Sequence, residues 1–317
     1  MKYYFVINPA SGTRKNREKM LEAIRSVCEE DGIKWEIYLT KEAKDGERFV
    51  RGICEKHRNS GKMLRIYACG GDGTINETVN GAYGFDNVEI GAIPLGTGND
   101  YIRNYGDAEH FLDIRRQLRG ISRYSDLIGY RAGYDGRTTQ RYCVNMFNIG
   151  FDCNVVDMTS RIKQLPFAKG PLAYLISVAI ILIKKKGADL RIEYPDGEVI
   201  DGRILLIAIA NGCYCGGGVK GVPYSITDDG MMDVSVVRDV TRRFFVRLFP
   251  SYSKGIHLEN EEMLRKNVIR YTKVRGLTVV ANGESLRLCT DGEITTQKKI
   301  EFFVADDGFR FIVPEGL

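Results

Sequence analysis

The first third of the chain alternates between two hydrophobic patterns. Short continuous apolar runs predict buried strands, and apolar positions three or four residues apart predict amphipathic helices. Strands that alternate with helices form parallel sheets with helices on both faces, so this part predicts a doubly wound α/β domain. The expected strands cover residues 2–8, 34–39, 64–69 and 88–94, and the expected helices cover residues 14–30, 42–58 and 75–83.

After about residue 125 the pattern changes to longer strands in which apolar and polar positions alternate. The sequence Pro195-Asp196-Gly197 predicts a hairpin turn between two of them. Such a run of strands is typical of an antiparallel β-sandwich or barrel. The expected strands cover residues 189–194, 199–211, 231–238, 268–271, 277–281, 286–289 and 299–304, and two expected helices cover 172–185 and 242–253.

We therefore expect two domains, an α/β domain over residues 1–127 and a mostly antiparallel β-sandwich domain over residues 128–305. The last expected strand, 309–313, could return to the first domain and carry residues 306–317 with it. A chain of 317 residues is long enough for each domain to bury its own core. Ligands of open parallel sheets bind at the carboxyl ends of the strands, so that edge is where a site is expected.

Composition excludes several classes of protein. Hydrophobic residues make up 44% of the chain and charged residues 27%, which excludes a disordered or collagen-like chain. No apolar run reaches the roughly 18–20 residues that a membrane span needs, and the N-terminus has no signal-peptide pattern, so we expect a cytoplasmic protein. The eight cysteines include no Cys-x-x-Cys pair, which argues against a zinc site and favours buried free thiols.

The strongest chemical signal is a glycine-rich loop that follows an expected strand and precedes an expected helix. Glycines let the backbone approach a phosphate closely, and the helix that follows directs its free N–H groups at the anion. A carboxylate beside a polyphosphate is repelled unless a divalent cation lies between them. Taken alone, this loop could also be an ordinary glycine turn with a capping aspartate. The loop reads Gly70-Gly71-Asp72-Gly73-Thr74.

Two further polar, glycine-bearing loops end neighbouring strands of the same expected sheet. Because the carboxyl ends of parallel strands meet at one edge, the three loops together predict a cradle for the phosphates of a nucleotide. Asp72, with Asp100 as a second candidate, would hold the metal. The chain has no P-loop sequence and no Gly-x-Gly-x-x-Gly after the first strand. The two loops read Asn8-Pro9-Ala10-Ser11-Gly12 and Pro94-Leu95-Gly96-Thr97-Gly98-Asn99-Asp100.

The three loops, with Asn76-Glu77, resemble those of the diacylglycerol kinase catalytic-domain family, which includes sphingosine and ceramide kinases and bacterial soluble lipid kinases. NAD kinases and phosphofructokinases carry loops similar to Gly70–Thr74. The loop that distinguishes the diacylglycerol kinase family is therefore the one that begins with Pro94. The resemblance implies a nucleotide domain plus a β-sandwich with the active site between them. It extends to segments in the family's order: Asn148–Asp152, Ala210–Gly212, Gly216–Gly218, Asp228–Asp233 and Asp291–Glu293.

The resemblance also implies roles for individual residues. Asp72, Asp100 and Asp126 are similar to the carboxylates around a catalytic magnesium, and Asp126 rests on the shorter match Ser125-Asp126-Leu127. Asp72 and Asp291 would be catalytic, with Asp291 taking the proton of the lipid hydroxyl. ATP would be held by Asn8, Pro9, Ala10, Ser11, Gly12, Thr40, Gly70, Gly71, Asp72, Gly73, Thr74, Ile75, Asn76 and Thr97.

A structural magnesium is a further implication of the resemblance. The side chain of Asp229 and the carbonyls of Ile226 and Met231 would bind it. The residues by themselves favour plain turns at Asp228-Asp229-Gly230 and at Asp291-Gly292. The resemblance thus implies an ATP- and Mg²⁺-dependent kinase that phosphorylates a hydroxyl of diacylglycerol or a similar lipid. An NAD-kinase-like enzyme and a non-catalytic nucleotide- or lipid-binding regulatory protein are the alternatives, and the intact Asp72 and Asp291 argue against the second.

The formal charge of +5 is concentrated in residues 184–186 and 238–254. A basic patch suits an anionic partner, although a solvated surface has the same composition. The helix expected near 242–253 places aromatic residues beside arginines, as interfacial helices do. We nevertheless favour the interpretation that this helix packs on the protein's own core. Pro250 should kink or end the helix. As partners we expect a lipid substrate at the membrane surface with peripheral membrane contact, no nucleic acid, and a homodimer through exposed sandwich edges as a possibility.

Overall fold

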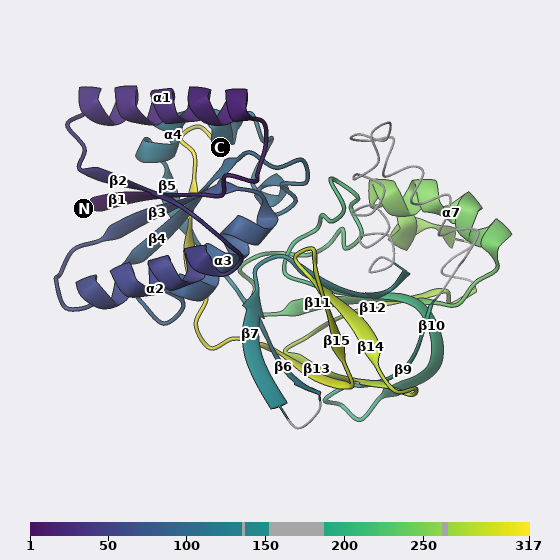
Figure 1. Ribbon diagram of the computed structural model, residues 1–317. Helices are drawn as coiled ribbons and strands as arrows, with labels where there is room; N and C mark the ends of the chain where they lie inside the picture. Colours follow the sequence, from purple (N-terminus) through teal and green to yellow (C-terminus); the bar gives the residue numbers. More distant parts are fainter. Residues whose placement is uncertain (135–136, 152–186, 262–265) are drawn as a thin grey trace. The chain divides into compact units, whose positions relative to one another are not determined.

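The computed structural model describes residues 1–134, 137–151, 187–261 and 266–317 (Figure 1). By its internal contacts the described chain divides into two units, Met1–Leu127 with Asp306–Leu317, and Ile128–Ala305. No helix of the described residues is long and apolar enough to cross a membrane. The helix expected over residues 172–185 lies outside the described residues. The seven described cysteines are free thiols, and five of them are buried.

The first unit is built on a six-stranded sheet in the order β2-β1-β3-β4-β17-β5. The first four strands of the chain pair in parallel, and β17, from the end of the chain, pairs in parallel with β4 and antiparallel with β5. Both central strands, β3 and β4, are buried along their whole length, which explains their mostly apolar sequences. The strands are β1 (Lys2–Ile7), β2 (Trp35–Leu39), β3 (Leu64–Gly70), β4 (Val88–Pro94), β5 (Ile121–Ser125) and β17 (Phe309–Val313).

Helices cover both faces of this sheet, with α1 and α4 on one face and α2 and α3 on the other (Figure 1). The doubly wound α/β fold expected from the sequence is therefore confirmed. Helix α1 begins after Thr13, whose Oγ1 accepts a hydrogen bond from the Asn16 N–H at 3.2 Å, and it buries one stripe of apolar side chains. The helices are α1 (Arg14–Glu30), α2 (Asp45–His57), α3 (Asp72–Ala82) and α4 (Ile114–Arg119), with short 3-10 turns at Ile102–Asn104 and His110–Leu112.

Helix α3 begins three residues earlier than the hydrophobic pattern predicts. Gly71 is its extended N-cap, so Asp72 is the first helical residue and Gly73 lies inside the first turn. The apolar pattern begins only at Ile75 and therefore missed this turn. An aspartate in the first turn is favourable because the helix dipole places partial positive charge there. This early start sets Asp72 directly beside the glycine turn that follows β3.

The second unit is a mostly antiparallel sandwich, as expected. Its strands pair in the order β15-β14-β8-β10-β9-β13-β16-β6-β7, and β11 lies between β10 and β12. Strand β10 pairs with β9 along its first half and with β8 along its second. The register of its pairing with β11 shifts between Ile204 and Leu206. The strands are β6 (Ile128–Tyr134), β7 (Arg137–Cys143), β8 (Met146–Gly150), β9 (Ala188–Glu193), β10 (Val199–Ala210), β11 (Met232–Arg238), β12 (Ile269–Val274), β13 (Gly276–Ala281), β14 (Leu286–Thr290), β15 (Glu293–Gln297) and β16 (Lys299–Val304).

Helix α7 (Arg242–Lys254) packs its apolar side on this sandwich, and a short 3-10 turn follows it at His257–Glu259. Phe245 and Tyr252 are buried in one cluster with residues of β10 and β11. The helix continues through Pro250 and ends at Gly255, which takes a left-handed conformation with φ of +78°. Pro250 was expected to kink or end the helix, and it does not end it.

Candidate active site

The three glycine-bearing loops of the first unit meet at the carboxyl edge of its sheet. The Asn8 N–H donates to the Cys69 carbonyl at 3.1 Å, and the Leu95 N–H donates to the Gly70 carbonyl at 2.8 Å. Gly12 has a φ of +67°, and a Cβ atom there would lie only 2.7 Å from the Leu95 oxygen. A side chain at Gly12 would therefore force apart the first loop (residues 8–12) and the third loop (residues 94–100).

Glycines also keep the second loop (residues 70–74) tightly turned and in close contact with the third loop. A Cβ on Gly70 would lie 2.1 Å from Thr74 Oγ1, and one on Gly96 would lie 3.0 Å from the Cα of Gly71. Within the first loop, Asn8 Oδ1 accepts the Ala10 N–H at 2.9 Å. These contacts fix bare backbone at the edge of the sheet, next to the first turn of α3. This is the arrangement with which helix N-termini and backbone N–H groups bind phosphate.

Two carboxylates border one small space beside these loops. A Cβ on Gly98 would lie 3.1 Å from Asp72 Oδ2 and 3.6 Å from Asp100 Oδ2. Burial raises the pKa of the Asp72 carboxyl above its ordinary value, and the charge of Asp100 raises it further. A divalent cation between the two would offset their repulsion. The pair fits a magnesium ion bound with nucleotide, because Mg²⁺ in such sites takes one or two carboxylates and completes its shell with phosphate oxygens and water.

Tyr101, which the sequence did not indicate, contacts both Asp72 and Ser125, the residue before the third expected carboxylate, Asp126. The Tyr101 N–H donates to Asp72 Oδ1 at 3.1 Å, and its hydroxyl donates to Ser125 Oγ at 2.8 Å, next to the buried Asp126. No three His, Cys, Asp or Glu side chains of the described residues gather closely enough to hold a metal together. Tyr101 therefore links Asp72 to Ser125, the residue that precedes Asp126.

An arginine also lies at the third loop. The Arg103 guanidinium donates to the Gly98 carbonyl from Nε at 3.4 Å and from Nη2 at 3.3 Å, and its Nε lies 3.8 Å from Asp100 Oδ1. Arginine is well suited to binding phosphate because its charge is fixed and its donors form a planar fork. The signal in the sequence is a basic residue three positions after Asp100, on the 3-10 turn.

Glu77 fixes the loop after β2, where Thr40 lies. Its Oε1 accepts the Lys44 N–H at 2.8 Å and its Oε2 accepts the Gly46 N–H at 3.2 Å, so α3 caps the start of α2. Lys44 has a φ of +63°, and this strained residue explains why α2 starts later than predicted. The buried Thr40 donates its N–H to the Ile7 carbonyl at 2.9 Å, which places it at the same sheet edge.

The remaining residues expected at the nucleotide divide by exposure. Pro9, Ala10 and Thr97 are exposed, and Ser11, Gly71, Gly73 and Asn76 are partly exposed, so all of these can face a ligand. Thr74 and Ile75 are buried and shape the turn from within. Asn76 Oδ1 accepts a hydrogen bond from Asn80 Nδ2 at 3.1 Å, one turn further along α3.

Asp291, in the second unit, is held in one orientation between β14 and β15. Its Oδ1 accepts hydrogen bonds from the N–H groups of Asn145 and Met146 at 3.2 and 3.1 Å, and its Oδ2 accepts the Val144 N–H at 3.0 Å. The Cys143 thiol donates to Oδ1 at 3.1 Å. Burial, and then the charge of Asp291, raises the pKa of that thiol well above its ordinary value, so it keeps its proton.

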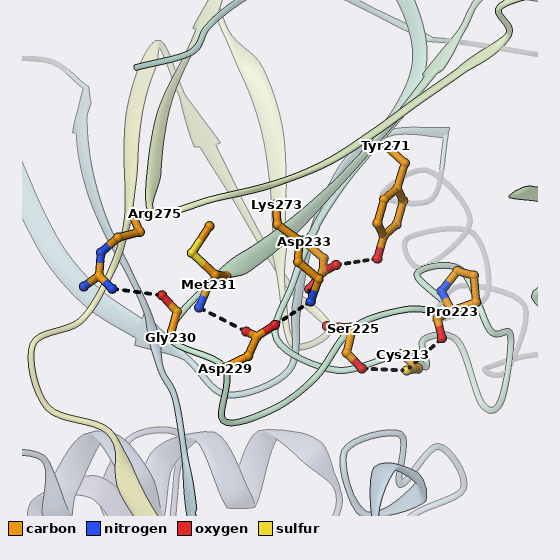
Figure 2. A network of polar contacts seen from close by, with 10 residues as sticks. All are labelled: Cys213, Pro223, Ser225, Asp229, Gly230, Met231, Asp233, Tyr271, Lys273 and Arg275. Atoms are coloured by element: carbon orange, nitrogen blue, oxygen red, sulfur yellow. Dashed lines mark hydrogen bonds and ion pairs between the residues drawn. The ribbon is translucent and has the colours of Figure 1, made fainter. Parts of the chain in front are cut away.

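Asp229, the side chain expected to bind a structural magnesium, has a lysine as its partner in this structure. Its Oδ2 lies 2.5 Å from Lys273 Nζ (Figure 2). Met231 faces Asp229 with its N–H, at 3.1 Å from Oδ1. Ile226 is 51% exposed. The sequence did not indicate Lys273, because its contact with Asp229 spans 44 positions.

Comparisons with known proteins match the two units of the chain to two different family models. A family model described as "Diacylglycerol kinase catalytic domain" matches residues 2–128, and one described as "YegS C-terminal NAD kinase beta sandwich-like domain" matches residues 145–304. The chain is 28% identical to a diacylglycerol kinase of Bacillus subtilis (strain 168) over 294 residues, which span 91% of this chain and 88% of that protein.

Another relative and one solved structure extend the likeness over nearly the whole chain. A diacylglycerol kinase of Staphylococcus carnosus (strain TM300) is 30% identical over 301 residues, across 94% of this chain and 90% of that protein. A crystal structure of a diacylglycerol kinase from Bacillus anthracis (strain Sterne) has a similar fold, with a TM-score of 0.67 and 19% identity. That alignment covers 99% of this chain and 97% of the other.

Proposed function

Because this chain belongs to the diacylglycerol kinase catalytic-domain family, we propose that it uses magnesium and ATP to phosphorylate a hydroxyl group of diacylglycerol or a similar lipid. The observation that carries the proposal is the pair Asp72 and Asp100, which borders one space beside three close-packed glycine loops. Carboxylates beside a phosphate cradle are understood most simply as ligands of a cation that travels with the nucleotide.

The first unit would bind and orient the nucleotide. Backbone N–H groups of the loops and of the first turn of α3 would donate to phosphate oxygens, and Arg103 would add a fixed positive charge. Magnesium, when bound by Asp72 and Asp100, would supply the charge that offsets the phosphate oxygens. Tyr101 would hold Asp72 through its N–H. These groups contribute positioning and electrostatic stabilisation, which dominate the catalysis of phosphoryl transfer.

Asp291 would act on the lipid. The lipid hydroxyl oxygen bonds to the γ-phosphorus, the bond from that phosphorus to the leaving ADP oxygen breaks, and the hydroxyl proton passes to the Asp291 carboxylate. The products are a phosphorylated lipid, which is phosphatidic acid in the diacylglycerol case, and ADP. Three backbone N–H groups and the Cys143 thiol hold this carboxylate in position, which favours one approach of the hydroxyl.

A kinase of NAD is the second candidate, since the family model that matches residues 145–304 is described as "NAD kinase beta sandwich-like" and the Gly70–Thr74 loop resembles a loop of NAD kinases. An acceptor screen separates the candidates. The purified protein is incubated with γ-labelled ATP, Mg²⁺ and either diacylglycerol in mixed micelles or NAD. Label in the lipid supports the proposal, and label in the dinucleotide supports the second candidate. Nucleotide binding without transfer to any acceptor would indicate a regulatory protein.

We also propose that α7 brings the enzyme to the surface of an anionic membrane. Its exposed side carries Arg242, Arg243, Arg247 and Lys254, while its aromatic residues Phe245 and Tyr252 are buried. Val246 is the exposed large apolar side chain among these charges, at 53%. The contact would therefore be mainly electrostatic and peripheral rather than inserted.

A further inference from the structure

A buried carboxylate lies on β11 in the second unit. Asp233 is fully buried, and it lies directly opposite Lys273 in the antiparallel pairing of β11 with β12. The Tyr271 hydroxyl, two positions along β12 and therefore on the same face, donates to Asp233 Oδ1. A buried carboxylate needs a counter-charge nearby, because removing an unpaired charge from water costs several kcal/mol.

The same lysine reaches the loop that precedes β11. Lys273 Nζ lies 3.2 Å from Asp233 Oδ2 and 2.5 Å from Asp229 Oδ2, so one ammonium joins the strand to the loop (Figure 2). The other oxygen of Asp229 accepts the Met231 N–H. Arg275, directly after the end of β12, donates from Nη1 to the Gly230 carbonyl at 3.1 Å. Two cationic side chains, one on β12 and one just beyond it, thus hold the turn at residues 229–231.

We propose that Lys273 is a built-in cation that takes the place of a structural metal ion. Its ammonium neutralises one carboxylate of the loop and one of the strand, as a bound divalent cation would. A lysine ammonium carries its three donors on a compact point charge, and here it lies between two carboxylate oxygens. A metal could bind these oxygens only after displacing Lys273, so the loop at 226–231 is held without a metal ion.

The lysine is half-buried rather than free in solvent. Its side chain is 31% exposed, against 23% for Asp229 and 0% for Asp233. Removing one partner of a buried ion pair is more destabilising than removing one of a surface pair, because it leaves the other charge buried and uncompensated. Lys273 therefore contributes to the local stability of the loop, and removing it frees two carboxylates that a divalent cation can then bridge.

Hydrogen exchange at residues 226–233, measured by mass spectrometry without nucleotide, tests the proposal. The wild-type protein is compared in EDTA, in millimolar Mg²⁺ and in millimolar Ca²⁺, and we expect the same exchange rates in all three. Lys273→Met should raise exchange in this segment roughly tenfold or more, and either cation should lower it again. Lys299→Met, on an exposed position of β16, is the matched control and should behave as wild type.

Two results would overturn the proposal. One is faster exchange of residues 226–233 in the wild-type protein after chelation, restored by Mg²⁺ or Ca²⁺, because that would show a metal holding the loop. The other is wild-type exchange in a folded Lys273→Met protein. The chelation arm needs no variant, so it decides the matter even when Lys273→Met does not fold.

Discussion

Asp72, the proposed cation ligand, carries a cost to the folded protein. Burial and the charge of Asp100 raise the pKa of its carboxyl, so the folded protein holds that proton more tightly than the unfolded chain. Stability is therefore lost as pH rises through the raised pKa, and it is not lost below the ordinary carboxyl pKa, where both states are protonated. Sites that bind cations commonly carry such a cost until the cation arrives.

The first prediction is that Asp72→Asn stabilises the metal-free protein while abolishing magnesium-dependent binding of ATP. The melting temperature in EDTA should rise by a few degrees at pH 8, because the amide carries no charge to bury. The gain should vanish below about pH 4, where the wild-type carboxyl is also neutral. Asp86→Asn, at an exposed turn, is the control. Unchanged magnesium-dependent ATP affinity in Asp72→Asn would remove this residue from the cation site.

The second prediction concerns Asp291. Asp291→Asn should leave ATP binding unchanged and lower kcat by roughly 10²- to 10⁴-fold, because it removes the proton acceptor and leaves the phosphate loops intact. Calorimetry gives the ATP affinity and a steady-state assay gives kcat. The amide also places a donor against backbone N–H groups, so the melting temperature is measured alongside. A folded variant with wild-type kcat would show that Asp291 does not accept the proton.

At the scale of elements, the loops depend on glycine where chains approach closely. The third prediction is that Gly12→Ala weakens ATP binding, because its methyl group would overlap the Leu95 carbonyl at 2.7 Å. Gly32→Ala is a matched control, since Gly32 has a similar φ of +62° and no atom within 4 Å of the added Cβ. Both variants pay about 1 kcal/mol for the left-handed backbone, and Gly12→Ala alone should lose ATP affinity. Equal ATP affinities would contradict the loop contact.

The fourth prediction concerns α7. Replacing Arg242, Arg243 and Arg247 with glutamine should weaken binding to vesicles that contain anionic lipid by about 100-fold, from about 1 kcal/mol per charge. High salt should remove most of the difference, since exposed charges are screened. The control replaces Lys34, Lys56 and Lys62, which are exposed in the first unit. Equal loss in both variants would indicate a general charge effect and no role for α7.

Several strands with mostly apolar or regularly alternating sequences were predicted, but β6 (Ile128–Tyr134) and the buried β8 (Met146–Gly150) were not. Strands β3 and β4 are buried throughout and were recognised within a residue. Strand β15 (Glu293–Gln297) has little apolar content and was missed, because its pairing with β14 supplies the order that its own sequence does not. The start of α2 was misplaced because Glu77, from another helix, caps it.

At the scale of the whole molecule, the sequence indicated both folds and the order of the motifs. It allowed residues 306–317 to return to the first domain, and β17 does lie between β4 and β5. The sequence could not indicate contacts between distant positions. Tyr101 and Lys273 act through carboxylates that other segments supply, and no short motif carries such contacts.

The central claim is that the protein moves a phosphoryl group from ATP to a lipid hydroxyl. The most direct measurement is the transfer of label from γ-labelled ATP to diacylglycerol in mixed micelles, with the wild-type protein, Asp72→Asn and Asp291→Asn side by side. We predict labelled phosphatidic acid with the wild-type protein in Mg²⁺, none in EDTA, and little with either variant. No label in any lipid from a folded wild-type protein that binds Mg–ATP, or equal label from all three proteins, would contradict the account.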